Sequence, residues 1–197
     1  CGNNGTALDF EIENYTATNA DIWVRIPTLA IGNNTISVYY KNNTVVGSGQ
    51  NATGVWDSNF KMVQHLEETG TGPRNDSTSN GDNYTTSGYA GNEKVSGVVD
   101  GSDNFNTSNK LANATNKGCF RQSSAITYSF WEKIPSGAGG GTMGAGGQEG
   151  NLYGGVEVGL NYFYYAWTPT NPESDTWIGN NSLSISANTW HYFVFQV

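Results

Sequence analysis

The sequence predicts an all-β fold: an antiparallel β-sandwich preceded by a small β-rich segment. Glycine and asparagine, which favour turns, are abundant, with 26 Gly and 25 Asn in 197 residues. The 25 aromatic residues favour strands and are numerous enough to build a core, which argues against disorder. Strong helix formers are scarce, with only seven Leu and 13% charged residues. An all-α fold is therefore excluded, and a doubly wound α/β fold is disfavoured.

Short strand-like runs separated by turn-rich stretches give the expected order of elements. In residues 8–15 apolar side chains alternate with three carboxylates, so the two sets lie on opposite faces of a strand. Residues 21–26 form the next expected strand, which ends before Pro27. Further strands are expected at 35–41, 61–67, 94–99, 125–134, 156–167 and 189–197. A linker is expected at 42–54, a long polar loop at 69–92 and a flexible hairpin loop at 137–147. This spacing is typical of a β-sandwich.

The charge balance disfavours nucleic acid and membranes as partners. Nine basic and 17 acidic residues give a formal net charge of −8. Nucleic-acid binding needs clustered Lys and Arg, but here they are dispersed, with Lys117 and Arg121 as the one close pair. No apolar run approaches the ~18 residues of a membrane-spanning helix, so we expect no membrane insertion.

Asparagine sequons point to an extracellular or cell-surface location. The chain has ten Asn-x-Ser/Thr sequons, where composition alone gives about five. Either Asn-rich turns beside Thr-rich strands raise the count, or the protein is a secreted glycoprotein. The candidate glycosylated residues are Asn4, Asn14, Asn33, Asn42, Asn51, Asn75, Asn83, Asn106, Asn113 and Asn180. Cys1 and Cys119 allow one disulfide at most, which does not fix a redox compartment.

Two family resemblances follow one another along the chain. The first rests on LDFEIENY followed by ADIWVRIPTLAIGNNTISVYY. These segments resemble, in order and spacing, a domain of unknown function found in bacterial and archaeal surface proteins, and they place a small β domain at residues 1–54. The second rests on HLEE, DSTSNGDN, VDGSDNF, ITYSFWEKIP and NTWHYFVF. Residues 55–197 thereby resemble a laminin-G-like, concanavalin A-like jelly roll.

Both resemblances imply incomplete domains. In the first family, strands precede the acidic strand; in the second, strands follow the one that contains TWHYFVF. Residues 192–197 are apolar on both faces, as in a central strand rather than an edge strand. We therefore expect the missing strands to come either from a continuation of the chain or from another subunit by strand addition.

The carboxylates of residues 8–15 allow a catalytic interpretation. Concanavalin-like glycoside hydrolases of the laminarinase type carry alternating carboxylates on one strand, and retaining hydrolysis needs two carboxyl groups about 5 Å apart. Asp9, Glu11 and Glu13 alternate in this way, but their order differs and they lie outside the jelly-roll segment. The simpler interpretation, which we favour, is a solvated polar strand face.

Calcium is a candidate ligand of two loops that lie close together in the resembling fold. Hard cations take carboxylate and carbonyl oxygens, which Asp- and Gly-rich loops supply. The residues are Asp76, Asn80, Asp82, Asp100 and Asp103. The alternative, which we favour, is that they form Asx-turns. His65 and His191, the only histidines, have no metal-ligand spacing, so zinc is not expected.

A run of aromatic residues in the expected strand 156–167 is a candidate ligand platform. Successive strand residues point to opposite faces, so one set of rings must lie at a surface, at an interface or under a loop. Rings beside Asn and Asp suit sugars, which stack their apolar faces on aromatic side chains. The candidates are Tyr162, Tyr164, Tyr165 and Trp167.

Together these features favour an extracellular, non-catalytic module of a cell-surface or secreted protein. Its expected roles are adhesion, glycan binding or the structure of a surface or filament, with glycans or other surface proteins as partners. The alternative is a glycoside hydrolase that uses Asp9, Glu11 and Glu13. Fold alone does not decide between these classes.

Overall fold

Strands and loops make up nearly all of the computed structural model, which describes residues 2–3, 6–40, 49–112, 125–146, 152–167 and 178–196. Among these residues the one helix is α1 (Ala52–Val55), so the predicted all-β class is confirmed. The chain divides into two units, residues 1–114 and 115–197, each described here by itself. The boundary predicted between 54 and 55 lies inside the first unit. The described part holds no helix with the length and apolar character needed to cross a membrane.

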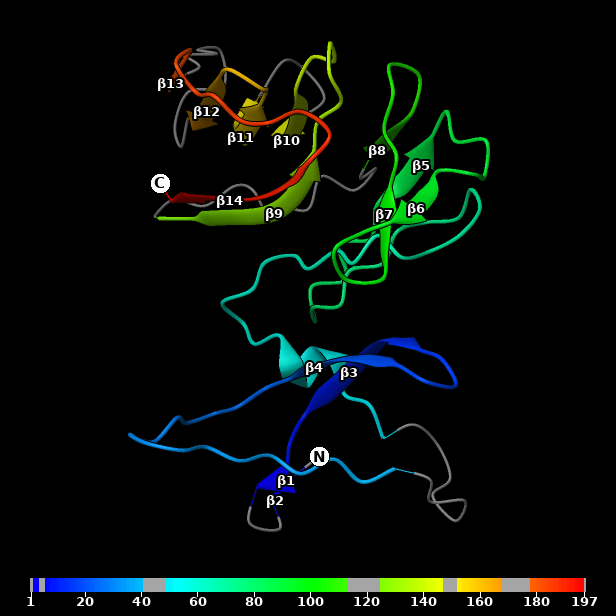
Figure 1. Cartoon of the computed structure of the whole chain (residues 1–197), viewed down its shortest axis with the longest axis vertical. Coiled ribbons are helices and arrows are strands. Elements are labelled where there is room, and N and C mark those ends of the chain that lie inside the picture. The colour runs from blue at the N-terminus through cyan, green and yellow to red at the C-terminus, as the bar shows by residue number, and fades with distance from the viewer. Residues whose placement is uncertain are drawn as a thin grey trace. The chain divides into compact units, whose positions relative to one another are not determined.

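The described residues of the first unit form four antiparallel strand pairs (Figure 1). They are β1 (Gly2–Asn3) with β2 (Thr6–Ala7), β3 (Phe10–Tyr15) with β4 (Ala20–Val24), β5 (Thr85–Ser87) with β8 (Lys110–Ala112), and β6 (Lys94–Ser96) with β7 (Gly101–Asp103). Between these short strands the chain runs as turns held by side-chain hydrogen bonds. The Asp- and Asn-rich composition of this part supplies those bonds.

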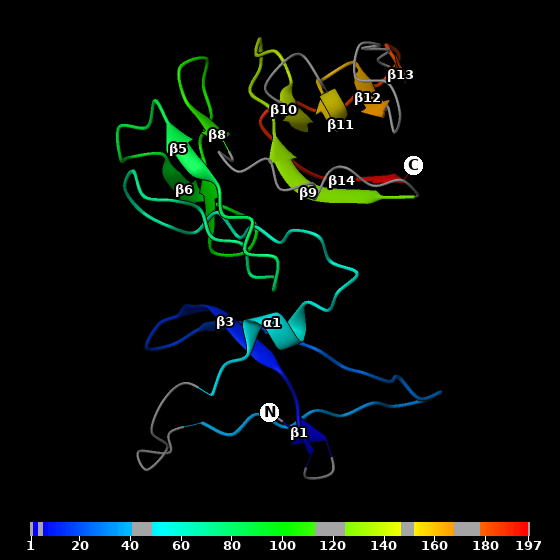
Figure 2. The same cartoon turned by 180° about the vertical axis from the view of Figure 1, so that it is seen from behind.

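The pair β3–β4 contains a bulge and contacts the helix α1. The register of β3 shifts between Ile12 and Asn14, so Glu13 is the extra residue of a bulge. Bulges bend a strand and redirect side chains. On the other side of β3, the backbone N–H of Asn51 donates a 2.9 Å hydrogen bond to the carbonyl of Phe10. This bond holds the start of α1 against β3, and Figure 2 shows the helix beside this strand.

The second unit is a two-layer sandwich. One sheet has the order β10 (Gly141–Gly146), β11 (Leu152–Val158), β12 (Phe163–Trp167), β13 (Ile178–Asn180); the other pairs β9 (Thr127–Lys133) with β14 (Trp190–Gln196). All pairings are antiparallel. The ring of Phe163 on β12 packs against that of Phe195 on β14, with centroids 5.8 Å apart. Val156 and Val158 on β11 are buried, so the core lies between the two sheets (Figure 1).

Two predicted strands do not form as expected. Residues 35–40 contain only an isolated bridge, and their apolar side chains are exposed. In 61–67 the only bridge joins Gln64 to Asp76. Leu66 has φ 58°, in the left-handed region, which interrupts an extended run. Propensity alone therefore overestimates strand content in these two segments.

The glycine-rich stretch differs from expectation in the opposite direction. Residues 141–146, inside the expected loop 137–147, form strand β10 and pair with the glycine-containing strand β11. Backbone hydrogen bonds suffice for this pairing, although glycine weakens a strand interior. The predicted strand 156–167 is two strands, because a turn at Leu160 and Asn161 separates β11 from β12.

Candidate functional site

A buried polar cluster, here called the His65 cluster, lies on one side of the β3–β4 pair in the first unit. Its members are Glu11, Glu13, Trp23, Trp56, His65 and Ser77. Nε2 of His65 lies 3.2 Å from Oε2 of Glu11, and Nδ1 lies 3.2 Å from Oε2 of Glu13. The imidazole thus bridges two carboxylates through both ring nitrogens. Both nitrogens carry a hydrogen only when the ring is charged, so the arrangement fits an imidazolium.

Both glutamates have further partners inside the cluster. Glu11 accepts hydrogen bonds of 2.6 Å from Nε1 of Trp56 and from Oγ of Ser77. Glu13, at 7% exposure, also accepts a hydrogen bond from Nε1 of Trp23. A carboxylate can lie out of water only when such donors replace its hydration. The cluster meets that requirement with two indoles, a hydroxyl and an imidazole.

Aromatic rings enclose the His65 imidazole. The ring stacks on Trp23 at a centroid distance of 5.8 Å and an interplanar angle of 30°. Trp56 lies 6.0 Å from the same imidazole and 5.4 Å from Trp23. On its other side Trp56 meets Phe60 edge-on at 5.1 Å. A cation over an indole face gains electrostatic attraction, and the rings also keep water out.

The surroundings of His65 shift its pKa in two directions. Burial disfavours the charged ring and lowers its pKa. Hydrogen bonds and charge from Glu13, together with those of Glu11, outweigh this effect, so the pKa of His65 is raised above its usual 6.5. The imidazolium is therefore the form that the folded cluster favours.

The expectation of a solvated carboxylate face on β3 is wrong. Glu11 and Glu13 are turned into the His65 cluster, and Asp9 accepts a 2.8 Å hydrogen bond from Nδ2 of Asn51. The error arose because alternation shows which side chains share a face but not what covers that face. His65 was the missed residue. The sequence offered no local signal for this contact, because His65 lies 54 positions after Glu11.

The residues of the predicted calcium set have protein partners in the described structure. Asp103 forms a bidentate ion pair with Arg74, with oxygens 2.7 Å from Nε and 2.9 Å from Nη2, and both side chains are fully buried. The hydroxyl of Tyr89 donates to Asp103 at 3.0 Å, and its ring lies 5.0 Å from the guanidinium. Asp100 pairs with Lys94 at 3.1 Å.

Asp76 organises the turn that follows Arg74. One of its oxygens accepts from the backbone N–H groups of Val63 and Thr78, and the other from the Thr78 hydroxyl and the N–H of Asp82. Asn80 donates to the carbonyl of Lys61 at 2.9 Å. The bond from the Thr78 N–H to Asp76 has the spacing of an Asx-turn, which was the favoured alternative to calcium. Among the described residues, no three His, Cys, Asp or Glu side chains gather as a metal ion would require.

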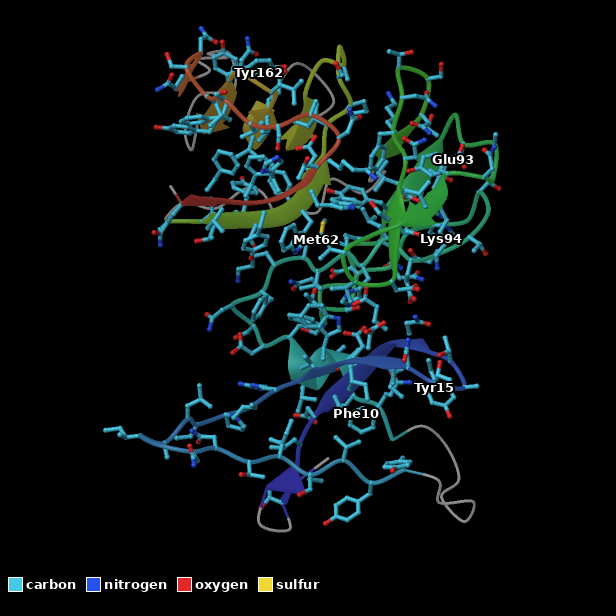
Figure 3. All side chains as sticks on the ribbon, viewed as in Figure 1. Phe10, Tyr15, Met62, Glu93, Lys94 and Tyr162 are labelled. Carbon is cyan, nitrogen blue, oxygen red and sulfur yellow. The ribbon has the colours of Figure 1, made fainter. Side chains whose placement is uncertain are left out.

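The predicted aromatic platform is divided between the two faces of its sheet. Tyr162 and Tyr164 lie side by side, with ring centroids 5.2 Å apart. The position of Tyr162 is labelled in Figure 3. Tyr162 donates to Glu157 at 2.9 Å, and Tyr164 bonds Oδ1 of Asn181. Strand alternation puts Tyr165 on the face of Phe163, which looks toward the other sheet. Trp167 pairs with Gly154 in the backbone, and its side chain lies outside the described part.

The candidate glycosylation sites differ in accessibility. Six are exposed: Asn33, Asn51, Asn75, Asn83, Asn106 and Asn180. Asn14 is half-buried, and its Nδ2 lies 3.4 Å from Oδ2 of Asp21. Asn4, Asn42 and Asn113, and the two cysteines Cys1 and Cys119, lie outside the described residues.

Comparison with known proteins bears on the first unit. No curated protein and no solved structure matches the chain. A family model does match, and its limits enclose the whole His65 cluster, from Glu11 to Ser77. The match confirms the first of the two resemblances and extends beyond residue 54. Residues 2–78 of this chain match the family described as a domain of unknown function, DUF2341.

Proposed function

We propose that the chain is an extracellular, non-catalytic module that binds glycans as part of a cell-surface or secreted protein. The observation that carries this proposal is the pair of Tyr162, which directly precedes β12, and Tyr164, which lies on it. The rings of Tyr162 and Tyr164 lie 5.2 Å apart, and their hydroxyls bond Glu157 and Asn181. Adjacent rings beside a carboxylate and an amide offer a sugar both an apolar face and hydrogen-bond partners.

The location rests on the ten sequons, six of which lie on exposed asparagines. Residues 55–197 resemble a laminin-G-like jelly roll, and this resemblance supports the same function. Two of the segments that carry the resemblance contain the strands β9 and β14. In this proposal calcium has an optional role in the loops of residues 76–103. Other surface proteins are the alternative partners.

The bonding of the β3 carboxylates favours a binding module over a glycoside hydrolase. A retaining hydrolase needs two carboxyl groups that face a bound sugar. Glu11 and Glu13 instead bond His65 and the indoles of Trp56 and Trp23. These bonds would have to break before either carboxylate could act on a substrate.

The test is a glycan-array screen of the purified chain with and without calcium. The proposal expects binding to at least one glycan class and a loss of about tenfold or more in affinity on Tyr164→Ala. Tyr39→Ala is the control, because Tyr39 is 85% exposed and belongs to the first unit rather than to β12. Absence of binding to every glycan would overturn the proposal. Cleavage of an oligosaccharide that Glu11→Gln abolishes would favour the hydrolase.

A further inference from the structure

The outer face of the β9–β14 sheet carries exposed aromatic side chains. They belong neither to the core nor to the pair of Tyr162 and Tyr164. Trp131 on β9 is 47% exposed and Tyr192 on β14 is 54% exposed. The two residues are directly opposite each other in the strand register, and their ring centroids are 5.1 Å apart. Large aromatic rings held half in solvent next to each other mark a binding surface more often than a structural need.

Strand alternation explains why these rings cannot enter the core. Phe130 and Phe193 form the neighbouring register pair and lie 5.6 Å apart on the inner face. Phe195 on the same inner face contacts Phe163 of the opposite sheet. Residues one position away from these, Trp131 and Tyr192, therefore point outward. Their exposure therefore follows from the strand register and not from the movement of a side chain.

Neighbouring pairs extend the outward face into a short strip. Lys133 and Trp190 are the next outward pair, with the ammonium 5.2 Å from the indole centroid. In the other direction Ser129 lies opposite Val194, which is 57% exposed. The strip thus holds aromatic rings flanked by a hydroxyl and one cation. Its position in the middle of paired strands keeps the rings in fixed relative positions.

We propose that Trp131 and Tyr192 form a second glycan-binding platform, which stacks successive rings of a neutral polysaccharide chain. This inference rests on the proposed function and places a binding site on the sheet opposite to Tyr162 and Tyr164. Tilted, adjacent aromatic rings give apolar contact to the faces of pyranose rings. The flanking Ser129 and Lys133 supply hydrogen bonds to hydroxyl groups.

Size and charge favour a neutral sugar chain over a protein or an acidic glycan. A stable protein interface buries about 800 Å² per partner with an apolar centre. The exposed apolar side chains on this strip, Trp131, Tyr192 and Val194, are each only about half exposed and offer much less. A formal charge of −8 repels acidic polysaccharides at long range, and Lys133 is the one cation of the strip.

The experiment uses the full chain in native affinity gels containing soluble β-glucan, xylan or mannan, followed by titration with the matching hexasaccharides. Trp131→Ala and Tyr192→Ala should each weaken binding by about tenfold or more, while Trp131→Phe retains most of it. Tyr39→Ala is the control, because Tyr39 is an 85% exposed tyrosine that does not belong to the strip, and it should bind like the wild type. Circular dichroism and thermal melting show whether each variant is folded.

The outcomes separate this inference from the proposed function. Binding that survives Trp131→Ala and Tyr192→Ala but is lost in Tyr164→Ala overturns the second platform and leaves the proposed function standing. Binding lost in the first two variants and kept in Tyr164→Ala supports the strip and overturns the role that the proposed function gives to Tyr164. A wild-type chain that binds none of the polysaccharides overturns both. Self-association that Trp131→Ala abolishes, without glycan binding, shows a protein interface and overturns the platform.

Discussion

Oγ of Ser77 donates a 2.6 Å hydrogen bond to Oε1 of Glu11, across 66 positions of the sequence. The same glutamate bonds Trp56 and His65, so residues from three separate places in the chain meet at one carboxylate. The segment from Trp56 to Ser77 is therefore anchored on β3. This relationship gives a physical reason why the family match continues past residue 54 to residue 78.

We predict that His65→Ala destabilises the first unit strongly. The substitution leaves Glu11 and Glu13 without the cation that lies between them, and His65 is only 11% exposed. Breaking a buried ion pair costs about 3–5 kcal/mol. We expect a loss of about 3 kcal/mol in the free energy of opening, measured by native-state hydrogen exchange of the β3 and β4 amides.

The matched control for that measurement is His191→Ala. His191 bonds Ser186 near the surface of the second unit, at 3.0 Å from its carbonyl. Removing the His191 side chain should change that free energy of opening by about 0.5 kcal/mol or less. Equal effects of the two substitutions would contradict the role given to the cluster.

The stability of the first unit should fall as the pH rises above neutrality. The pKa of His65 is raised above 6.5 in the folded protein, because the two glutamates outweigh the effect of burial. A group with a raised folded pKa contributes its full stabilisation below the unfolded pKa, near 6.5, and loses it as the pH passes the folded value. Thermal melting from pH 6 to 9 should show this fall, and His65→Gln should remove it. A variant with the same pH slope as the wild type would contradict the assignment.

The sequence predicted the fold class well because the class depends on average properties. The alternation of residues 8–15 located β3, and the aromatic runs located β9, β12 and β14. Residues 35–40 were predicted as a strand on propensity, but a strand needs a partner, which propensity does not report. Strand β10 was missed for the opposite reason, since its pairing uses backbone groups that glycine also has.

The site was harder to predict than the fold because it depends on long-range contacts. Glu11 and Glu13 were correctly placed on one strand face, but their partner His65 comes more than 50 positions later. Nothing in local spacing joins them. Likewise Asp103 was grouped with loop carboxylates, while its actual partner Arg74 lies 29 positions earlier. Charge type alone does not tell an ion pair from a metal ligand.

We predict that the exposed sequons carry N-glycans when the protein comes from its native, glycosylating host. Asn83 is exposed in a turn-rich stretch, whereas Asn14 is half-buried beside Asp21. Glycan addition needs an accessible amide, so Asn83 should be occupied and Asn14 should not. Intact-mass analysis should give more than 21.2 kDa, and peptide mapping should locate the sugars. An unmodified chain from that host would contradict the prediction.

The buried pair of Arg74 and Asp103 should contribute more to stability than the exposed ion pairs among the described residues. Both side chains are fully buried, so Asp103→Ala leaves a guanidinium without its bidentate partner, at a cost of about 3–5 kcal/mol. Arg25 and Asp57 form the control pair at 3.4 Å, with exposures of 40% and 34%. Asp57→Ala should cost less than about 1 kcal/mol. Urea denaturation of both variants measures the difference.

Calcium separates the two roles proposed for Asp103. If the carboxylate serves only the ion pair, millimolar calcium leaves the urea midpoint of the wild type unchanged. If it also binds the ion, calcium raises that midpoint, because a ligand that binds only the folded state stabilises it, and Asp103→Ala removes the increase.

The double variant Arg74→Met with Asp103→Leu should cost less stability than the sum of the single variants Arg74→Met and Asp103→Leu, since neither charge is then left alone in the interior. Additive costs would mean that the two residues do not act as a pair.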